Sequence, residues 1–144
     1  MRRRGKFGMS GLPWQDPIWA GCEKHKPIRN GPRWPIVRAG TNQGNKVAKY
    51  HEDMTLDEIE ELEMSFIDSD HLIYERRGVR YYYGNSFGGG VVGASYGEDT
   101  SFIVIQRYQA GHVHGYPETR QRLIDRMRKY NPELLVKFLE RFPS

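Results

Sequence analysis

Apolar residues recur every three or four positions between residues 55 and 67, which is the spacing of one face of an α-helix. The stripe consists of Leu56, Ile59, Leu62 and Phe66. Thr55 and Glu58 stand at the two ends of a capping box, in which each side chain accepts a hydrogen bond from the other residue's backbone N–H. Acidic side chains fill most of the remaining positions. The pattern therefore predicts an acidic amphipathic helix that ends near Ile67.

Four shorter runs of β-branched and aromatic residues follow, and turn residues separate them. They cover residues 71–75, 79–83, 91–95 and 102–108. The connections are shorter than the crossover that parallel strands need, so the pattern predicts a four-stranded antiparallel meander. Residues 102–105 are apolar without interruption, which predicts a central strand that is covered on both faces.

Helical spacing returns in the C-terminal part of the chain, where two apolar stripes meet at Asn131-Pro132. The first stripe contains Leu123, Ile124, Met127 and Tyr130, and the second contains Leu134, Leu135, Phe138, Leu139 and Phe142. Pro117 suits the first turn of the first helix, and Asn131 can cap the second helix with Pro132 at its first position. The fold class that we expect is therefore α+β: an acidic amphipathic helix, a four-stranded antiparallel meander and two C-terminal helices.

Residues 1–48 have no such period, because Pro and Gly interrupt them repeatedly. We expect an extended basic N-terminal arm over 1–48 and a single α+β domain over 49–144. The arm holds the three tryptophans of the chain, Trp14, Trp19 and Trp34, which are too much apolar surface for an inert tail. Either the arm wraps its own domain, or these residues bind a partner protein; the sequence leaves both readings open.

The net charge of +4 conceals three blocks of different sign. Residues 1–50 carry eleven Lys or Arg and two acids, residues 51–70 carry nine acids and no Lys or Arg, and the remainder carries eleven bases and seven acids. Blocks of opposite charge favour different partners, or they neutralise each other within the molecule.

A chain of 144 residues fits one domain. It contains no run near the roughly 18 consecutive apolar residues of a membrane span. Its single cysteine, Cys22, excludes an internal disulfide and fits a reducing compartment. We therefore expect a soluble, cytoplasmic protein with no membrane partner.

Arginine and tyrosine cluster in two places, the predicted hairpin after residue 71 and one face of the first C-terminal helix. The candidate nucleic-acid-binding residues are Arg76, Arg77, Arg80, Tyr82, Arg122, Arg126 and Lys129. Cationic side chains neutralise phosphates, and an exposed tyrosine on a sheet can stack on a base. We therefore expect a small nucleic-acid-binding protein that uses these clusters and the basic arm. Whether the ligand is RNA or DNA stays open.

Two other functions are compatible with the same sequence. An adaptor protein would dock on larger partners through its arm and its acidic helix. A metal-independent ribonuclease would use His112 and His114 for proton transfer and Arg120 for the charge that develops on phosphate. The chain has no motif of a metalloprotease, serine hydrolase or phosphate-loop enzyme, so a non-enzymatic role is favoured.

Cys22, His25, His112 and His114 are residue types that bind zinc. Their spacing does not match the paired ligands of zinc fingers, so they form only a weak candidate site. We expect no metal and no cofactor.

Overall fold

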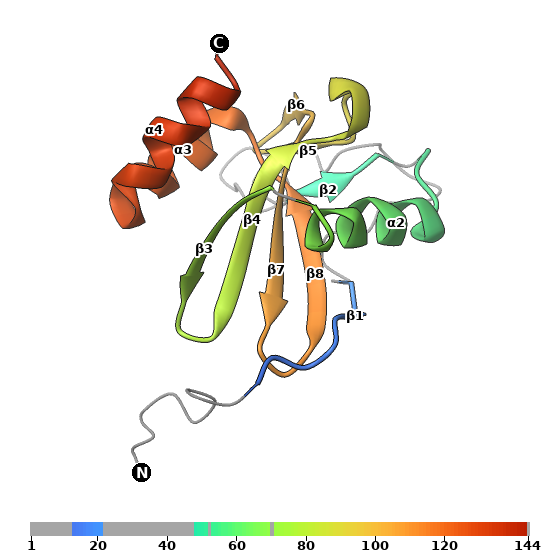
Figure 1. Ribbon diagram of the computed structural model, residues 1–144. Helices are drawn as coiled ribbons and strands as arrows, with labels where there is room; N and C mark the ends of the chain where they lie inside the picture. The colour runs from blue at the N-terminus through green and yellow to red at the C-terminus, as the bar shows by residue number, and fades with distance from the viewer. Residues whose placement is uncertain (1–12, 22–47, 52, 70, 144) are drawn as a thin grey trace, which may run out of the picture.

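The computed structural model of the 144-residue chain describes residues 13–21, 48–51, 53–69 and 71–143. Its helices are α2 (Leu56–Ile67), α3 (Arg120–Tyr130) and α4 (Pro132–Arg141), with a short 3₁₀ turn, η2 (Phe87–Gly89). Its strands are β1 (Ile18–Trp19), β2 (Lys49–Tyr50), β3 (Leu72–Arg76), β4 (Val79–Asn85), β5 (Gly93–Ser95), β6 (Glu98–Thr100), β7 (Phe102–Tyr108) and β8 (His112–Pro117). A five-stranded sheet has the order β1-β8-β7-β4-β3, and a three-stranded sheet has the order β2-β5-β6 (Figure 1).

The α+β class and the three helices are confirmed, because the signals that predict them are local. Thr55 accepts from the backbone N–H of Glu58 at 3.1 Å, and Glu58 accepts from that of Thr55 at 2.8 Å. Asn131 caps α4 by accepting from the backbone N–H of Leu134. The expectation for Pro117 is wrong: this residue ends β8, and Thr119 caps α3 instead.

The four-stranded meander is wrong. The run 91–95 contributes β5 to the small sheet, and β7 pairs with β4 and with β8, which follows it through a tight turn. The strand β8 was not predicted, because it contains the polar residues His112 and His114 and the glycine at 115 in place of β-branched residues. A Cβ at Gly115 would lie 2.5 Å from the backbone carbonyl oxygen of Val104, so the close approach of β8 to its neighbour requires glycine.

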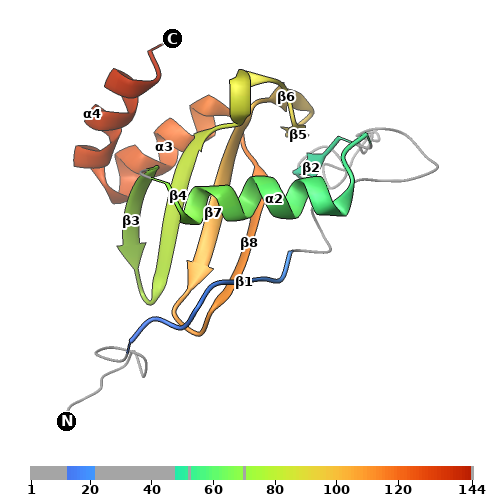
Figure 2. The ribbon, with the colours of Figure 1, turned by 45° about the vertical axis from the view of Figure 1, so that its right-hand side comes forward.

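The strand β7 is central and covered on both faces, as its uninterrupted apolar run predicts. Ile103 and Ile105 belong to a core beneath α2, whereas Val104 belongs to a second core beneath α3 and α4. All three side chains are fully buried. Figure 2 shows α2 crossing one face of the large sheet, with α3 on the other side. The acidic helix and the arginine-rich helix therefore lie on opposite faces.

A buried carboxylic acid, Glu63, ties four elements together on the α2 face. Its Oε1 accepts from Trp19 Nε1 at 2.7 Å, and its Oε2 accepts from the Tyr50 hydroxyl at 2.6 Å. The backbone of Gly115 adds a third hydrogen bond. Only 1% of the Glu63 side chain is exposed, and this burial raises its pKa to about 7. One side chain of α2 thus joins β1, β2 and β8.

The described part of the predicted arm lies on the chain's own sheet. The short strand β1 pairs in parallel with β8, with Trp19 opposite Val113. The Trp14 ring lies 4.0 Å from the guanidinium of Arg80. Most of the arm, including Trp34, is outside the described residues. Among the residues that the structure does describe, no helix is long and apolar enough to cross a bilayer.

The Glu63→Gln variant tests the ionisation of this buried group. Folded Glu63 keeps its proton up to about pH 7, whereas the unfolded chain releases it near 4.5. The unfolded state therefore loses its proton first, and Glu63 makes the protein less stable as the pH rises from 4.5 to 7. This loss, on the order of 3 kcal/mol, should be absent in Glu63→Gln. Urea unfolding of both proteins across this pH range measures the difference.

The exposed Glu61, on the same helix, provides the control Glu61→Gln. This variant should keep the pH dependence of the wild type. If Glu63→Gln also keeps it, the carboxyl does not titrate as described. A ¹³C NMR titration of the Glu63 carboxyl in the wild type gives the same answer without any substitution.

Candidate phosphate-binding site

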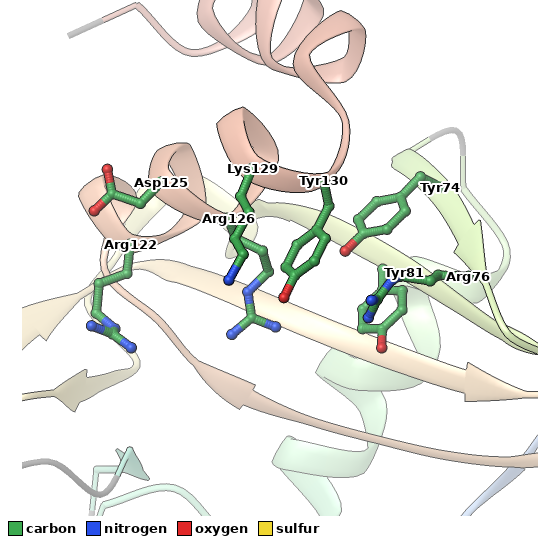
Figure 3. Close-up of a pocket in the computed structure, with 8 residues that line it drawn as sticks. All are labelled: Tyr74, Arg76, Tyr81, Arg122, Asp125, Arg126, Lys129 and Tyr130. Atoms are coloured by element: carbon green, nitrogen blue, oxygen red, sulfur yellow. The ribbon is translucent and has the colours of Figure 1, made fainter.

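A pocket of about 350 Å³ lies between the β3–β4 hairpin and α3. Its lining residues are Tyr74, Arg76, Tyr81, Arg122, Asp125, Arg126, Lys129 and Tyr130. Figure 3 shows the side chains of Arg122, Arg126 and Tyr130 pointing down from the helix, with those of the hairpin beside them. Four cations and one acid thus line a single pocket.

The periodicities of strand and helix bring these residues together. Side chains two positions apart on a strand share a face, so Tyr74 and Arg76 point to the same side of β3. Tyr81 is the register partner of Tyr74 on β4. On α3, the pocket cations follow the spacing i, i+4, i+7, from Arg122 to Lys129. The pocket therefore forms where one strand face meets one helix face.

Tyrosine rings form the neutral part of the pocket. The rings of Tyr74 and Tyr81 stack with centroids 4.9 Å apart, and the Tyr83 hydroxyl donates to that of Tyr74 at 3.1 Å. Burial raises the pKa of Tyr74, so its hydroxyl stays protonated and able to donate. Tyr130, which is 43% exposed, carries the Arg76 guanidinium 4.4 Å from its ring centre. Phenol groups and cations thus line the pocket together.

Arg126 is the half-buried cation of the pocket. Burial opposes its charge, but the neighbouring Tyr116, Tyr83 and Glu118 hold its pKa above the ordinary value. It also hydrogen-bonds the side chain of Tyr116. Among the described residues, no carboxylate lies within ion-pair distance of Arg126, Arg76 or Lys129. Because a partly buried cation is stabilised by an anion, this arrangement suits an anionic ligand.

The other two charged residues of the pocket have partners within the chain. Arg122 pairs with the buried Glu118 at 3.3 Å and lies 3.8 Å from the ring centre of Tyr96. Asp125 accepts from Gln121 at 3.0 Å and from Arg128 at 3.5 Å. Arg76, Arg126 and Lys129 are consequently the cations that an anion would meet.

The remaining predicted nucleic-acid-binding residues do not line the pocket. Arg77 occupies the turn, with a positive φ of 53°. Arg80 lies on the opposite face of the sheet, between Glu75 at 3.2 Å and the ring of Trp14. Tyr82 is buried in the core beneath α2, with 2% of its surface exposed. The alternation of side chains along β3 and β4 thus places Arg76 and Arg80 on opposite faces of the sheet.

The structure does not bring the three predicted catalytic residues together. His112 and His114 lie on β8, where both rings stack on Tyr108, with centroids 4.2 and 5.6 Å away. Arg120 instead donates to the carbonyl of Phe142 at 2.7 Å, at the end of α4.

The weak zinc site is likewise not assembled in the part of the chain that the structure describes. No three His, Cys, Asp or Glu side chains of that part group as metal ligands. Cys22 and His25 lie outside it.

Three tyrosines of the pocket were not predicted from the sequence: Tyr74, Tyr81 and Tyr130. Tyr74 and Tyr81 could have been found, because a two-residue turn at 77–78 makes them register partners. Tyr130 continues the apolar stripe of α3, and only the packing of the helix shows that its ring reaches the pocket.

Comparison of the chain with known proteins gave no match to a family model, to a curated protein or to a solved structure. Inferences about this pocket therefore depend on the residues that line it.

Proposed function

We propose that the protein binds nucleic acid by holding a backbone phosphate in the pocket between the β3–β4 hairpin and α3. The observation that supports this most directly is the half-buried Arg126, flanked by Arg76 and Lys129 without a carboxylate partner among the described residues. A guanidinium presents two parallel N–H donors that match two phosphate oxygens. An ammonium and tyrosine hydroxyls complete a set of donors typical of phosphate sites.

The distribution of charge supports the same proposal. The acidic residues of α2 would repel a polyanion, but the sheet lies between that helix and the pocket. One further cation, Arg77 in the turn next to Arg76, is exposed and would extend the positive rim. A chain of phosphates gains from such a rim, whereas a single small anion needs only the pocket.

The Arg126→Ala variant tests the phosphate contact. Loss of one charged hydrogen-bonding partner should weaken binding of a fluorescent oligonucleotide by about 10- to 100-fold. Because one phosphate contact disappears, the slope of log affinity against log salt should become shallower by about 0.7 to 0.9. Fluorescence anisotropy over a series of salt concentrations measures both quantities.

Arg128→Ala is the matched control, because it removes the same charge from a position of α3 outside the pocket. Its affinity should fall by less than about threefold, as expected for a screened, exposed charge. Equal effects of the two variants would show attraction by net charge alone and would contradict a phosphate site at Arg126. Absence of binding at low salt would eliminate the proposal.

A second pair of variants uses the division of the hairpin between two faces. Arg76→Ala should weaken oligonucleotide binding about tenfold, because Arg76 lies in the pocket. Arg80→Ala should leave binding nearly unchanged, since Arg80 lies against Trp14 on the other face. The same anisotropy assay decides the question, and a larger effect of Arg80→Ala would place the ligand on the α2 face.

A further inference from the structure

The sheet face that holds the pocket continues beyond it across β7 and β8. Tyr81 on β4 has Gln106 as its register partner on β7, and Gln106 has His114 on β8. One step nearer the β7–β8 turn, His112 stacks on Tyr108. We call these four residues, Gln106, Tyr108, His112 and His114, the aromatic band. It runs from the pocket toward the far side of the sheet.

The helices leave the aromatic band uncovered. In the row above it, Tyr83 and Val104 are fully buried beneath α3 and α4. In the band itself, Gln106, Tyr108 and His114 are only half-buried, and His112 is exposed. The part of the sheet that the helices leave uncovered therefore begins at the level of Tyr81, which lines the pocket.

The three aromatic rings of the band are stacked on one another. The rings of Tyr108 and His112 are inclined by 14°, and those of Tyr108 and His114 by 27°. Burial and the neighbouring His112 lower the pKa of His114, so its ring is neutral at pH 7. Because His112 is the exposed member of this stack, a base can extend the stack on its outer face.

The distance between band and pocket suits a short stretch of nucleic acid. Adjacent strands of a sheet lie about 4.8 Å apart, so β4 and β8 are separated by about 10 Å. A few nucleotides of a single strand can span this separation. A phosphate in the pocket beside β4 and a base at His112 on β8 can thus belong to the same short segment.

We propose that the ligand is single-stranded nucleic acid, with an unpaired base stacked on the exposed ring of His112, in line with Tyr108, while a phosphate of the same strand occupies the Arg126 pocket. This inference rests on the proposed function and specifies its substrate class. In a duplex the faces of the bases are covered by their neighbours, so only an unpaired or terminal base can lie on a protein ring. A duplex would therefore use the pocket alone.

The test compares fluorescein-labelled oligouridylate and oligodeoxythymidylate of about 12 nucleotides with a duplex of the same length. The wild type should bind at least one single strand about tenfold more tightly than the duplex. The variant His112→Ala should lose about tenfold in affinity for that single strand and almost nothing for the duplex. Its salt dependence should equal that of the wild type, because no phosphate contact is removed.

Two further variants keep the test independent of folding defects. Tyr108→Phe retains the ring and should bind the single strand like the wild type. His112→Trp enlarges the exposed ring and should strengthen binding by about threefold. Far-UV circular dichroism of each variant confirms that it is folded.

Failure of this inference can be distinguished from failure of the proposed function. Equal affinity for single strand and duplex, or an unchanged affinity in His112→Ala and His112→Trp, would overturn the stacking site. In that case Arg126→Ala would still reduce binding and its salt dependence. Absence of binding to every probe at low salt would overturn both proposals.

Discussion

The alternation of side chains along the central strands β4 and β7 determines what each face of this protein contains. Helices cover both faces of the sheet where these strands cross its middle, so every second side chain there must fit the core beneath α2 and the others the core beneath α3 and α4. Ile103 and Ile105 turn to the first core and Val104 to the second. The same constraint sends Arg80 toward Trp14 and leaves Tyr81 in the pocket. The acidic helix α2 and the arginines of α3 are kept on opposite faces.

Glu63 shows how the α2 face accommodates a polar group. Burial disfavours its charged form, yet donors from Trp19, Tyr50 and Gly115 surround the carboxyl and satisfy its oxygens. Leaving those buried donors without an acceptor would cost about 1–3 kcal/mol each. The carboxyl therefore holds β1 and β2 against the domain, and it supports β8 from one face while the histidines of β8 lie on the other.

Local features of the fold could be predicted from the sequence, and non-local ones could not. The capping box at Thr55 and the Asn131-Pro132 junction locate helices because they act within one turn. The meander failed because the run 91–95 pairs with β2, which is more than 40 residues earlier in the chain. In the candidate site, helical spacing correctly places Arg122, Arg126 and Lys129 on one face of α3. The arginines of the hairpin were predicted as one cluster, but the alternation of side chains along a strand puts Arg80 on the face opposite to the pocket. The aromatic band could not be predicted, because the histidines and the glycine of β8 do not give the sequence pattern of a strand.

The separation of charge across the sheet leads to one central claim, that a polyanion occupies the α3 face and leaves the α2 face free. Backbone amide NMR spectra, recorded while a single-stranded oligonucleotide is added at moderate salt, test it most directly. The account predicts chemical-shift changes that are concentrated in β3, β4 and α3 and extend to His112, with little change along α2. Changes centred on α2 or around Trp14, or spectra that do not change at all, would contradict it.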